Sequence, residues 1–532
     1  MYFHNLKFDG SFLVDYAVRN GILKECLIDG NSGMWYFVKV QLDIVCEFRD
    51  TLKKFPQSSI NDIARIFNIQ GKTDKPDFEK YRPNNYKPTK EEIEYCKQDS
   101  HIIAVAMKHE LDKGNTSLTL ATDCFKDLKS RIIYDKWYPR IDVKIDTWLR
   151  PALRGGYTYL KPEYKGIEIN DIWVHDENSE YPYVTSYKPL PYWLPFQVEE
   201  PEPEQLYVVK FKSEFELRKG FVPTIELKYN FRYGHTEYVT ESKGETEICL
   251  TSVDYELFKK HYKLDYEIDN EYIAFNSKVG ICKPYVDYWY LEKVIAKLEK
   301  KDYEYWISKI RNNNSWGKLT TNPEHTNLIP YLDNDDAISY NRVNSVGNPL
   351  YLPHGLFVTA WARWDLITEI QNNYDIFIYG DTDSIHTLGK PKFLKQTKDL
   401  FVDLELVEIL EKYGKMDKLD DYVLGAWKQE GWHDYKIFPR GKYLKSKMYL
   451  HADENYRPFR EFENPLTGKL SDVRLTQDDL LRSEIKAVGM TDEIKEKITW
   501  DNFNVGSKFD GMLKKNSVKG GCLLRKTDYT IK

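Results

Sequence analysis

The sequence has little of what several classes of protein require. Only 7 of its 532 residues are cysteines, and no two of them form a Cys-x-x-Cys pair, so neither a disulfide framework nor a zinc site is predicted. No apolar run is long enough to cross a bilayer, and the first residues lack the pattern of a signal peptide. The net charge of -6 argues against a uniformly basic surface. We therefore expect a soluble protein with reduced thiols, on which any surface for nucleic acid is local.

Length and composition indicate a large chain with more than one core. A chain of 532 residues exceeds what one hydrophobic core normally supports, so several domains are expected. Its 40 tyrosines and 13 tryptophans suit either stacking on nucleobases or a large aromatic core. Basic residues gather in two stretches, 436–447 and 508–526, which are candidates for contact with phosphates.

The most informative stretch is the hexapeptide YGDTDS at residues 379–384. Apolar residues flank it on both sides, which predicts a strand, a tight turn and a second strand. Asp381 and Asp383 are two positions apart, and the period of two along a strand would send both carboxylates to the same side. Most acidic turns are only solvated, and a calcium loop is excluded because Ile385 and His386 stand where an EF-hand needs an oxygen ligand and a glycine. If the two carboxylates converge, they need a cation.

A further carboxylate follows a predicted strand far upstream. The apolar residues 172–174 lead into Asp176, and the chain then turns at Pro182. A strand that ends on an aspartate is a second candidate for binding a cation. Tyr181 stands beside this turn, and a tyrosine at such a place is also typical of a hydrophobic core.

Between these two segments lies a predicted helix with a basic face. Over residues 290–314 apolar side chains recur on one side and lysines lie opposite. Lys309 and Asn313 are one turn apart near its end, so a cation and an amide on one face can meet phosphate oxygens, and Trp316 follows them. Lysines on a helix are more often only a solvated face. The phosphate-binding interpretation therefore depends on the order of the segments.

The N-terminal part carries weaker signals. Residues 89–92 form a capping box that predicts the start of a helix. Tyr95 and Asp99 are four apart on it, so the phenol and the carboxylate share one face. Upstream, Asn5 and Asp9 are also four apart. Each pair alone is common by chance.

Taken in chain order, these segments resemble the motifs of the family B DNA polymerases. Residues 176–182 resemble motif A, residues 309–318 motif B and residues 379–384 motif C. The resemblance implies a DNA-directed DNA polymerase that transfers phosphoryl groups with two Mg²⁺ ions, which Mn²⁺ can replace. It implies catalytic and metal-binding roles for Asp176, Asp381 and Asp383; nucleotide binding by Tyr181, Lys309, Asn313, Trp316 and Thr382; and DNA binding by Arg154, Gly155, Gly156, Lys447 and Tyr449.

Asn5, Asp9, Tyr95 and Asp99 resemble the second and third exonuclease motifs of the same family. The resemblance implies that Asp9 and Asp99 hold metals and that Tyr95 orients the attacking water. The family pattern also includes an Asp-x-Glu on an earlier strand, which would precede Met1. We therefore expect an exonuclease remnant with impaired proofreading.

The resemblance implies an α+β multidomain fold, in which an RNase H-like exonuclease remnant is followed by a right-hand polymerase of palm, fingers and thumb with two insertions. The second insertion has turn signals at residues 334–336, as a projecting hairpin would. The predicted boundaries are 1–125 for the exonuclease-like domain, 126–187 for the first part of the palm, 188–284 for the first insertion, 285–319 for the fingers, 320–352 for the second insertion, 353–487 for the second part of the palm and 488–532 for the thumb.

Two insertions at these places resemble the protein-primed branch of family B, which occurs in small tailed phages and linear plasmids. That resemblance implies template and primer DNA, dNTPs and a terminal, priming protein as partners. It also implies a monomer without membrane association, encoded by a phage, prophage or plasmid and acting in the cytoplasm of a bacterial host.

Two other functions stay open at this stage. A reverse transcriptase also uses paired aspartates in a hairpin, but there they are usually adjacent, unlike Asp381 and Asp383. The other is a decayed polymerase that only binds DNA or a terminal protein, which the incomplete exonuclease motifs favour. Retention of all the palm carboxylates disfavours it, because buried carboxylates without a metal lower stability.

Overall fold

The chain forms two structural units in a computed structural model that describes residues 1–72, 76, 80, 82–83, 85–227, 237–431, 437–452, 459–463, 470–474, 483–518 and 521–532. Unit 1 comprises Met1–Val143, Pro284–Tyr351 and Lys515–Leu524, and unit 2 comprises Lys144–Lys283, Leu352–Lys514 and Arg525–Lys532. Lys436 and Lys519, from the two basic stretches, lie outside the described residues. Within the described part, no helix is both long and apolar enough to cross a membrane.

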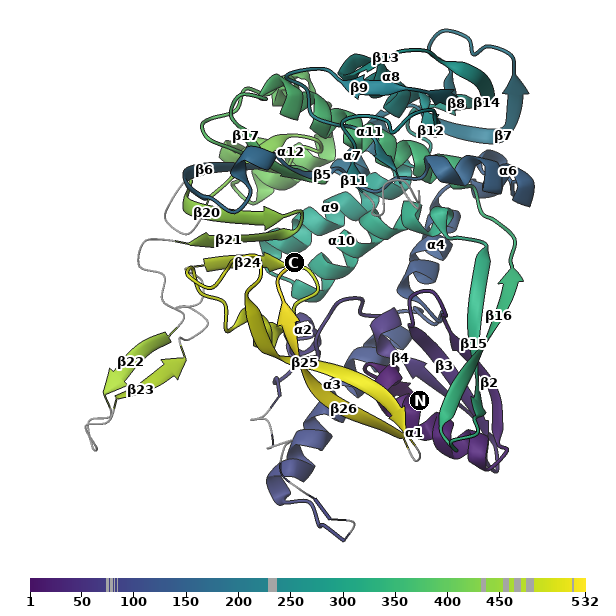
Figure 1. Ribbon diagram of the computed structural model, residues 1–532, viewed down its shortest axis with the longest axis vertical. Helices are drawn as coiled ribbons and strands as arrows, with labels where there is room; N and C mark the ends of the chain where they lie inside the picture. Colours follow the sequence, from purple (N-terminus) through teal and green to yellow (C-terminus); the bar gives the residue numbers. More distant parts are fainter. Residues whose placement is uncertain are drawn as a thin grey trace. The chain divides into compact units, whose positions relative to one another are not determined.

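Unit 1 contains a four-stranded sheet with a helix packed on it. The strand order is β1 (Tyr2–Phe3), β4 (Val45–Asp50), β3 (Trp35–Gln41) and β2 (Leu23–Ile28), with β1 parallel to β4 and the other pairs antiparallel (Figure 1). Helix α1 (Leu6–Arg19) buries Leu6, Val14 and Ala17 in the same apolar cluster as Val38 of β3. The helix and sheet therefore share one core.

Helices make up most of the rest of unit 1. They are α2 (Ile60–Ile66), α3 (Lys90–Asp112), α4 (Leu120–Arg131), α5 (Tyr134–Trp137), α9 (Lys283–Glu299) and α10 (Asp302–Gly317). The predicted capping box is confirmed, because Thr89 and Glu92 bond each other's backbone N–H at the start of α3. The single helix predicted over residues 290–314 is wrong: α9 ends before α10 begins. Lys300 between them has a φ of 55°, a left-handed conformation that ends a helix.

The predicted hairpin of the second insertion is confirmed. Strands β15 (Glu324–Leu332) and β16 (Ile338–Val346) pair in antiparallel register along their whole length. The side chain of Asn327 accepts from the Ile28 N–H at 2.9 Å and donates to the Cys26 carbonyl at 3.0 Å. At the turn, Arg19 donates to Asp336 at 2.6 Å. The hairpin is thus held to α1 and β2 within unit 1.

Unit 2 is built on an eight-stranded sheet. Its order is β24 (Ser483–Ala487), β21 (Met448–Ala452), β20 (Phe438–Lys445), β6 (Glu168–Glu177), β18 (Ser384–Thr387), β17 (Phe377–Asp381) and β5 (Thr158–Leu160), with β19 (Trp427–Glu430) also pairing β6. Two helices pack together beside it, α7 (Glu180–Tyr187) and the largely buried α11 (Leu352–Asn372). The expected strand before Asp176 is confirmed as β6.

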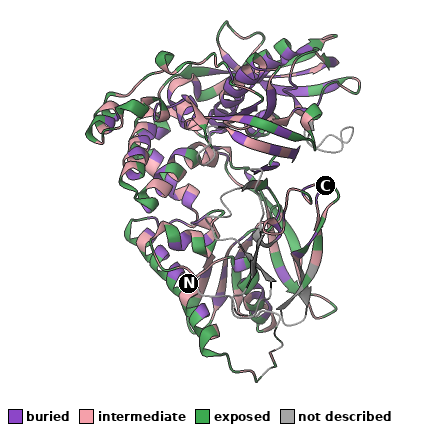
Figure 2. Cartoon of the chain, turned by 90° about the vertical axis from the view of Figure 1, so that its left-hand side faces the viewer, coloured by how far each residue is buried: buried purple, intermediate pink, exposed green. Residues whose placement is uncertain are grey.

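A second sheet in unit 2 fills the first predicted insertion. Its order is β12 (Thr246–Thr251), β8 (Leu206–Ser213), β14 (Ile268–Lys278) and β7 (Leu190–Val198), and α8 (Ser252–His261) packs on it. The remaining elements of this unit are α6 (Val143–Leu149), β9 (Phe215–Leu217), β10 (Glu226–Leu227), β11 (Glu237–Tyr238), β13 (Tyr262–Leu264), α12 (Leu404–Lys412), β22 (Phe459–Glu463), β23 (Leu470–Arg474) and α14 (Asp492–Lys495). The chain ends in the hairpin β25 (Lys508–Val518) and β26 (Gly521–Thr530). Buried and exposed residues alternate along many of these elements (Figure 2).

Candidate active site

The hairpin at YGDTDS is tighter than the sequence suggests. Asp381 is the last residue of β17 and pairs with Ser384, the first residue of β18, so only Thr382 and Asp383 form the turn. Thr382 has a φ of 62°, and the Asp383 N–H donates to the Asp381 carbonyl at 2.7 Å. The premise that both aspartates follow the period of a strand is therefore wrong, because Asp383 lies in the turn.

The sheet brings motif A beside this turn. Strand β6 pairs with β18 so that Asp176 stands opposite Ser384, and the Glu177 N–H donates to the Asp383 carbonyl at 2.7 Å. Both Asp176 and Asp383 are half-buried. Two carboxylates that are far apart in the sequence are thus placed on neighbouring backbone positions.

Asp381 already has several polar partners. The Lys447 ammonium lies 2.5 Å from its carboxylate, the Tyr379 hydroxyl donates to it at 3.1 Å, and the hydroxyls of Thr158 and Thr382 donate at 3.2 and 3.1 Å. In the described part of the chain, no group of three or more acidic, histidine or cysteine side chains is arranged to hold a metal ion. The pairing of β6 with β18 thus places Asp176 near Asp383, whereas Asp381 forms an ion pair with Lys447.

Two further carboxylates behind motif A were not singled out from the sequence. Glu177 is fully buried and forms an ion pair with Lys395, and burial raises the pKa of Glu177 to about 7 although the ammonium opposes this. Glu180 is 1% exposed, neither of its carboxylate oxygens has a hydrogen-bond partner, and burial raises its pKa well above the usual value. The sequence signal was visible: two glutamates lie within four residues of Asp176.

The predicted DNA-binding segment at residues 154–156 is partly buried. Arg154 is 7% exposed and donates to the Cys249 carbonyl at 2.9 Å, so its guanidinium serves the interior and the expectation that it contacts DNA is not supported. A Cβ built on Gly156 would lie 2.7 Å from the Thr382 hydroxyl oxygen, whereas one on Gly155 would meet open space. Glycine at 156 is what lets this segment lie against the motif C turn.

Of the Lys-x-Tyr segment, only the lysine is accessible. The Lys447 side chain is 47% exposed, whereas Tyr449 is 6% exposed and packs against Tyr379 and Tyr443. The Tyr443 hydroxyl also joins two buried histidines, at 2.7 Å from Nδ1 of His386 and 2.8 Å from Nε2 of His451. The ring of Tyr449 is part of the core at the eight-stranded sheet, so any contact of this residue with DNA stays a prediction.

The predicted nucleotide-binding residues lie on α7 and in the motif C turn of unit 2, where Thr382 stands, and on α10 of unit 1. Tyr181 is half-buried on α7, and burial raises the pKa of its hydroxyl. On α10, Lys309 and Asn313 are exposed and one turn apart, and Trp316 is half-buried in the last turn. The placement of Lys309 and Asn313 on one face is as the helical spacing predicts, whereas the helix α7 that carries Tyr181 was not predicted.

The exonuclease-like residues of unit 1 fall on α1 and α3. Asp9 is exposed in the first turn of α1, and Asn5 precedes that helix in a left-handed conformation. Lys72, which the sequence interpretation missed, donates to Asp99 at 2.9 Å and to the Tyr95 hydroxyl at 3.1 Å. Burial opposes it, yet these two partners hold the pKa of Lys72 above its ordinary value. No motif marked Lys72, because its partners are distant in the sequence.

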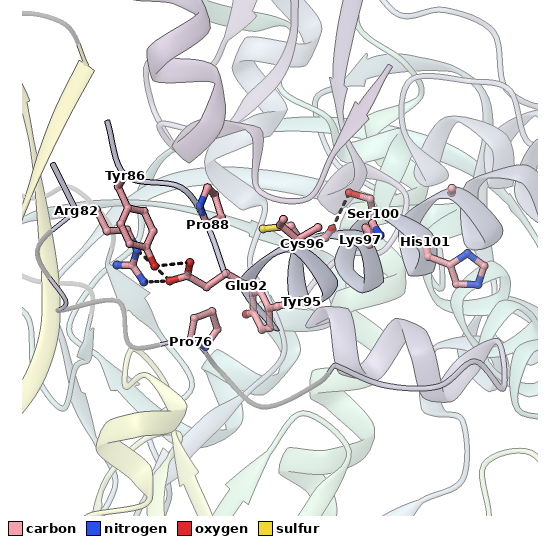
Figure 3. A pocket seen from close by; sticks show the side chains of 12 residues that line it. Pro76, Arg82, Tyr86, Pro88, Glu92, Tyr95, Cys96, Lys97, Ser100 and His101 are labelled. Carbon is pink, nitrogen blue, oxygen red and sulfur yellow. Dashed lines mark hydrogen bonds and ion pairs between the residues drawn. The ribbon is translucent and has the colours of Figure 1, made fainter. Parts of the chain in front are cut away.

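A pocket of about 940 Å³ opens on the same helix α3. Tyr95, Cys96 and Ser100 line one side of it, and Arg82 and Tyr86 both contact Glu92 at its end (Figure 3). It belongs to unit 1 and contains none of the residues predicted for nucleotidyl transfer. We assign it no part in that reaction.

Carboxylates on an antiparallel sheet, and a helix that bears an exposed lysine and asparagine, are residue types that nucleotidyltransferases of the polymerase class use. Residues 70–399 match the family described as DNA polymerase type B, organellar and viral. The chain therefore belongs to this family and is a DNA-directed DNA polymerase. Enzymes of the family depend on divalent metal ions.

Full-length relatives support the same assignment. The chain is 35% identical over 563 residues to the DNA polymerase of Bacillus phage Nf, covering 100% of this chain and 91% of that protein. It is 29% identical over 554 residues to the DNA polymerase of Streptococcus phage Cp-1, covering 100% and 87%. Its fold is similar to that of phi29 DNA polymerase complexed with primer-template DNA and incoming nucleotide substrates, with a TM-score of 0.80 and 31% identity over 100% of this chain and 90% of that one. The α+β multidomain prediction is confirmed, and a reverse transcriptase is disfavoured.

Proposed function

We propose that this polymerase extends a DNA 3' end from dNTPs, with Asp176 and Asp383 holding the metal ions. The observation that carries the proposal is the pairing of β6 with β18, which joins the Glu177 N–H to the Asp383 carbonyl at 2.7 Å. Carboxylate oxygens are the ligands that Mg²⁺ prefers, so the donor set fits two Mg²⁺ ions, which Mn²⁺ can replace. When bound, such ions lower the pKa of the primer hydroxyl and offset charge on the triphosphate.

Asp381 and Lys447 would act as a pair at the primer end. The half-exposed ammonium of Lys447 is 2.5 Å from Asp381, which holds it beside the hairpin. A cation at this place can turn to a phosphate of the primer strand while the carboxylate keeps it close. Asp381 would then serve catalysis mainly by positioning Lys447, and secondarily as a further carboxylate of the metal site.

We assign binding of the incoming nucleotide to residues on α7, α10 and the motif C turn. Lys309 and Asn313 are exposed on one face of α10, where an ammonium and an amide can meet triphosphate oxygens. Tyr181 would pack under the sugar and exclude a 2'-hydroxyl, and Thr382 and Trp316 would complete the nucleotide site. In this assignment α9 and α10 are the fingers, and the eight-stranded sheet is the palm.

Initiation on a protein primer is the second part of the proposal. The relatives are phage DNA polymerases, and the two predicted insertions form the sheet β12-β8-β14-β7 and the hairpin β15–β16 in this chain, which supports a protein-primed enzyme. A terminal protein would supply the first hydroxyl, and template DNA, primer DNA and dNTPs would follow. We place the enzyme in the cytoplasm of a bacterial host, encoded by a phage, prophage or plasmid.

For the exonuclease-like region we propose weak proofreading. Asp99, one of its two candidate metal-binding carboxylates, is engaged by the Lys72 ammonium at 2.9 Å. The other, Asp9, is exposed in the first turn of α1. Release of mononucleotides from single-stranded DNA at a rate comparable with synthesis, abolished by Asp99→Ala, would contradict this part.

The main test is extension of a primed DNA template with Mg²⁺. Asp383→Ala and Asp176→Asn should each abolish synthesis, because each removes one of the two carboxylates to which the proposal assigns the metal ions. Asp375→Asn is a matched control, since Asp375 is exposed just before β17 and should be dispensable. A folded wild-type chain that binds primed DNA but adds no nucleotide would support the alternative of a decayed, DNA-binding polymerase.

A further inference from the structure

Lys395 is a charged group under the palm site for which the proposed reaction has no role. Its side chain is 15% exposed, and its ammonium pairs with Glu177, which is fully buried, and lies 3.4 Å from Asp365 of α11. The ammonium also lies 4.5 Å from the centre of the Tyr183 ring on α7. Burial of a lysine ammonium lowers stability unless the charge is paired, so these contacts indicate that Lys395 has a specific structural or functional role.

Glu177 connects this lysine to both catalytic segments. It directly follows Asp176 on β6, and its N–H donates to the carbonyl of Asp383 at 2.7 Å. The backbone of Glu177 is thus fixed to motif C while its side chain is fixed to Lys395. Any rotation of β6 that moved Asp176 away from Asp383 would have to break one of these two contacts.

The loop that carries Lys395 is itself held in place. Its own N–H donates to one carboxylate oxygen of Glu369 at 2.8 Å, and the Leu394 N–H donates to the other at 2.9 Å. Glu369 lies on α11, which packs against α7. The ammonium is therefore presented from a backbone that the palm helix fixes.

Lys395 also faces an excess of negative charge. The carboxylate of Glu180 has no hydrogen-bond partner and is influenced by Glu177, Asp383 and Asp365, whereas Lys395 is the cation that acts on it most. Without Lys395, the buried carboxylate of Glu177 would lose its ion pair, because Lys188, the other lysine of this cluster, pairs with Asp365. The side chain of Glu177 would then no longer be held at the end of β6.

We propose that Lys395 is a positioning residue for nucleotidyl transfer, which, through Glu177, sets the distance between Asp176 and Asp383. The inference rests on the proposed role of these two aspartates as metal ligands. Lys395 touches neither substrate nor metal in this account; it prepares the two carboxylates to share ions. Loss of the lysine should therefore change the dependence on metal as well as the rate.

The test is single-turnover incorporation of one dNTP on a primed template, titrated with Mg²⁺. Lys395→Met should lower the maximal rate roughly tenfold to hundredfold, as small displacements of reacting groups do. It should raise the midpoint of the Mg²⁺ titration several-fold but change the apparent dNTP affinity by less than about threefold. Lys395→Arg, which keeps the charge and donors, should restore most of the rate.

A matched control and a second variant separate positioning from stability. Lys188 pairs with Asp365 at 2.7 Å in the same cluster but forms no ion pair with Glu177, so Lys188→Met should shift the Mg²⁺ midpoint much less than Lys395→Met does. Glu177→Met/Lys395→Met removes the whole pair and leaves neither charge unpaired, a change that folded proteins often tolerate. The double variant should fold and show the same loss of rate and the same shift in midpoint.

Two outcomes distinguish this inference from the proposed function. Rates are compared per folded molecule. If Lys395→Met or the double variant keeps the wild-type rate and Mg²⁺ midpoint, the positioning role of Lys395 is overturned. If Asp383→Ala is inactive in the same assay, the proposed polymerase site is still supported. If the folded wild-type chain itself incorporates no nucleotide, the proposed function fails with it.

Discussion

Replacement of Arg363 by methionine should destabilise unit 2 by about 3–5 kcal/mol. The side chain of Arg363 is 2% exposed and donates to both carboxylate oxygens of Asp254 at 2.8 and 2.7 Å. It also donates to the carbonyls of Arg154 and Gly155 at 2.9 and 2.7 Å. The substitution would leave a buried carboxylate without its counter-ion and remove a donor from two backbone carbonyls, of which that of Arg154 is buried, so the loss should exceed that of an ordinary surface change.

Urea unfolding followed by far-UV circular dichroism measures this loss, and hydrogen exchange of β12 and α11 amides assigns it to unit 2. Lys260→Met is the control: Lys260 is an exposed residue of α8, the helix that carries Asp254, and it should stay within about 0.5 kcal/mol of wild type. Asp254→Asn/Arg363→Met removes both charges and should recover part of the loss. The reasoning fails if the single variant is within about 1 kcal/mol of wild type or if the double variant is no more stable than the single.

Three further expectations concern other parts of the molecule. Burial lowers the pKa of His386 to about 3, so only the unfolded chain binds a proton at this side chain as the pH falls below about 6.5. The free energy of unfolding should therefore fall by about 1.4 kcal/mol for this group between pH 7.5 and pH 5.5. Urea unfolding at the two pH values measures this, and a stability that is constant or rises on acidification would contradict it. Lys54→Met should destabilise unit 1 by about 3–5 kcal/mol in the same assay, because it leaves the carboxylate of Asp123, which is 4% exposed, without the ammonium of Lys54. Lys53→Met, at the neighbouring position, should destabilise far less, and equal effects of the two substitutions would show that the buried ion pair is unimportant. Lys447→Ala should weaken binding to primed DNA and reduce the slope of log Kd against log salt concentration by about one. Fluorescence anisotropy measures this slope, and an unchanged slope would exclude a contact between Lys447 and a phosphate.

Local signals in the sequence predicted the parts of the site that depend on neighbouring residues. The presence of a tight turn between β17 and β18 follows from short polar residues between β-forming runs, although the place of Asp383 within that turn was not predicted, and the start of α3 follows from the capping box at Thr89. The spacing of Lys309 and Asn313 needed only helical geometry. These features are decided within a few residues, so the sequence carries them in full.

Features decided by distant partners could not be predicted in this way. The Lys395–Glu177 ion pair joins residues 218 positions apart, and each of them alone looks like an ordinary surface charge. Arg154 is buried with its guanidinium donating to the carbonyls of Ala152 and Cys249, and no hydropathy pattern reveals these contacts. The break at Lys300 was missed because apolar periodicity continues across it and lysine is not a typical helix terminator.

The close approach of Gly156 to Thr382 links the side-chain sizes that are allowed at two positions far apart in the sequence. A methyl group at position 156 would collide with the Thr382 side chain, so the side-chain volumes at these two positions depend on each other. Among sequences that share this fold, a larger residue at 156 should therefore occur only with a smaller one at 382. In directed evolution of such a polymerase, the two positions are best varied jointly, since a library that varies either one alone would sample mostly clashes.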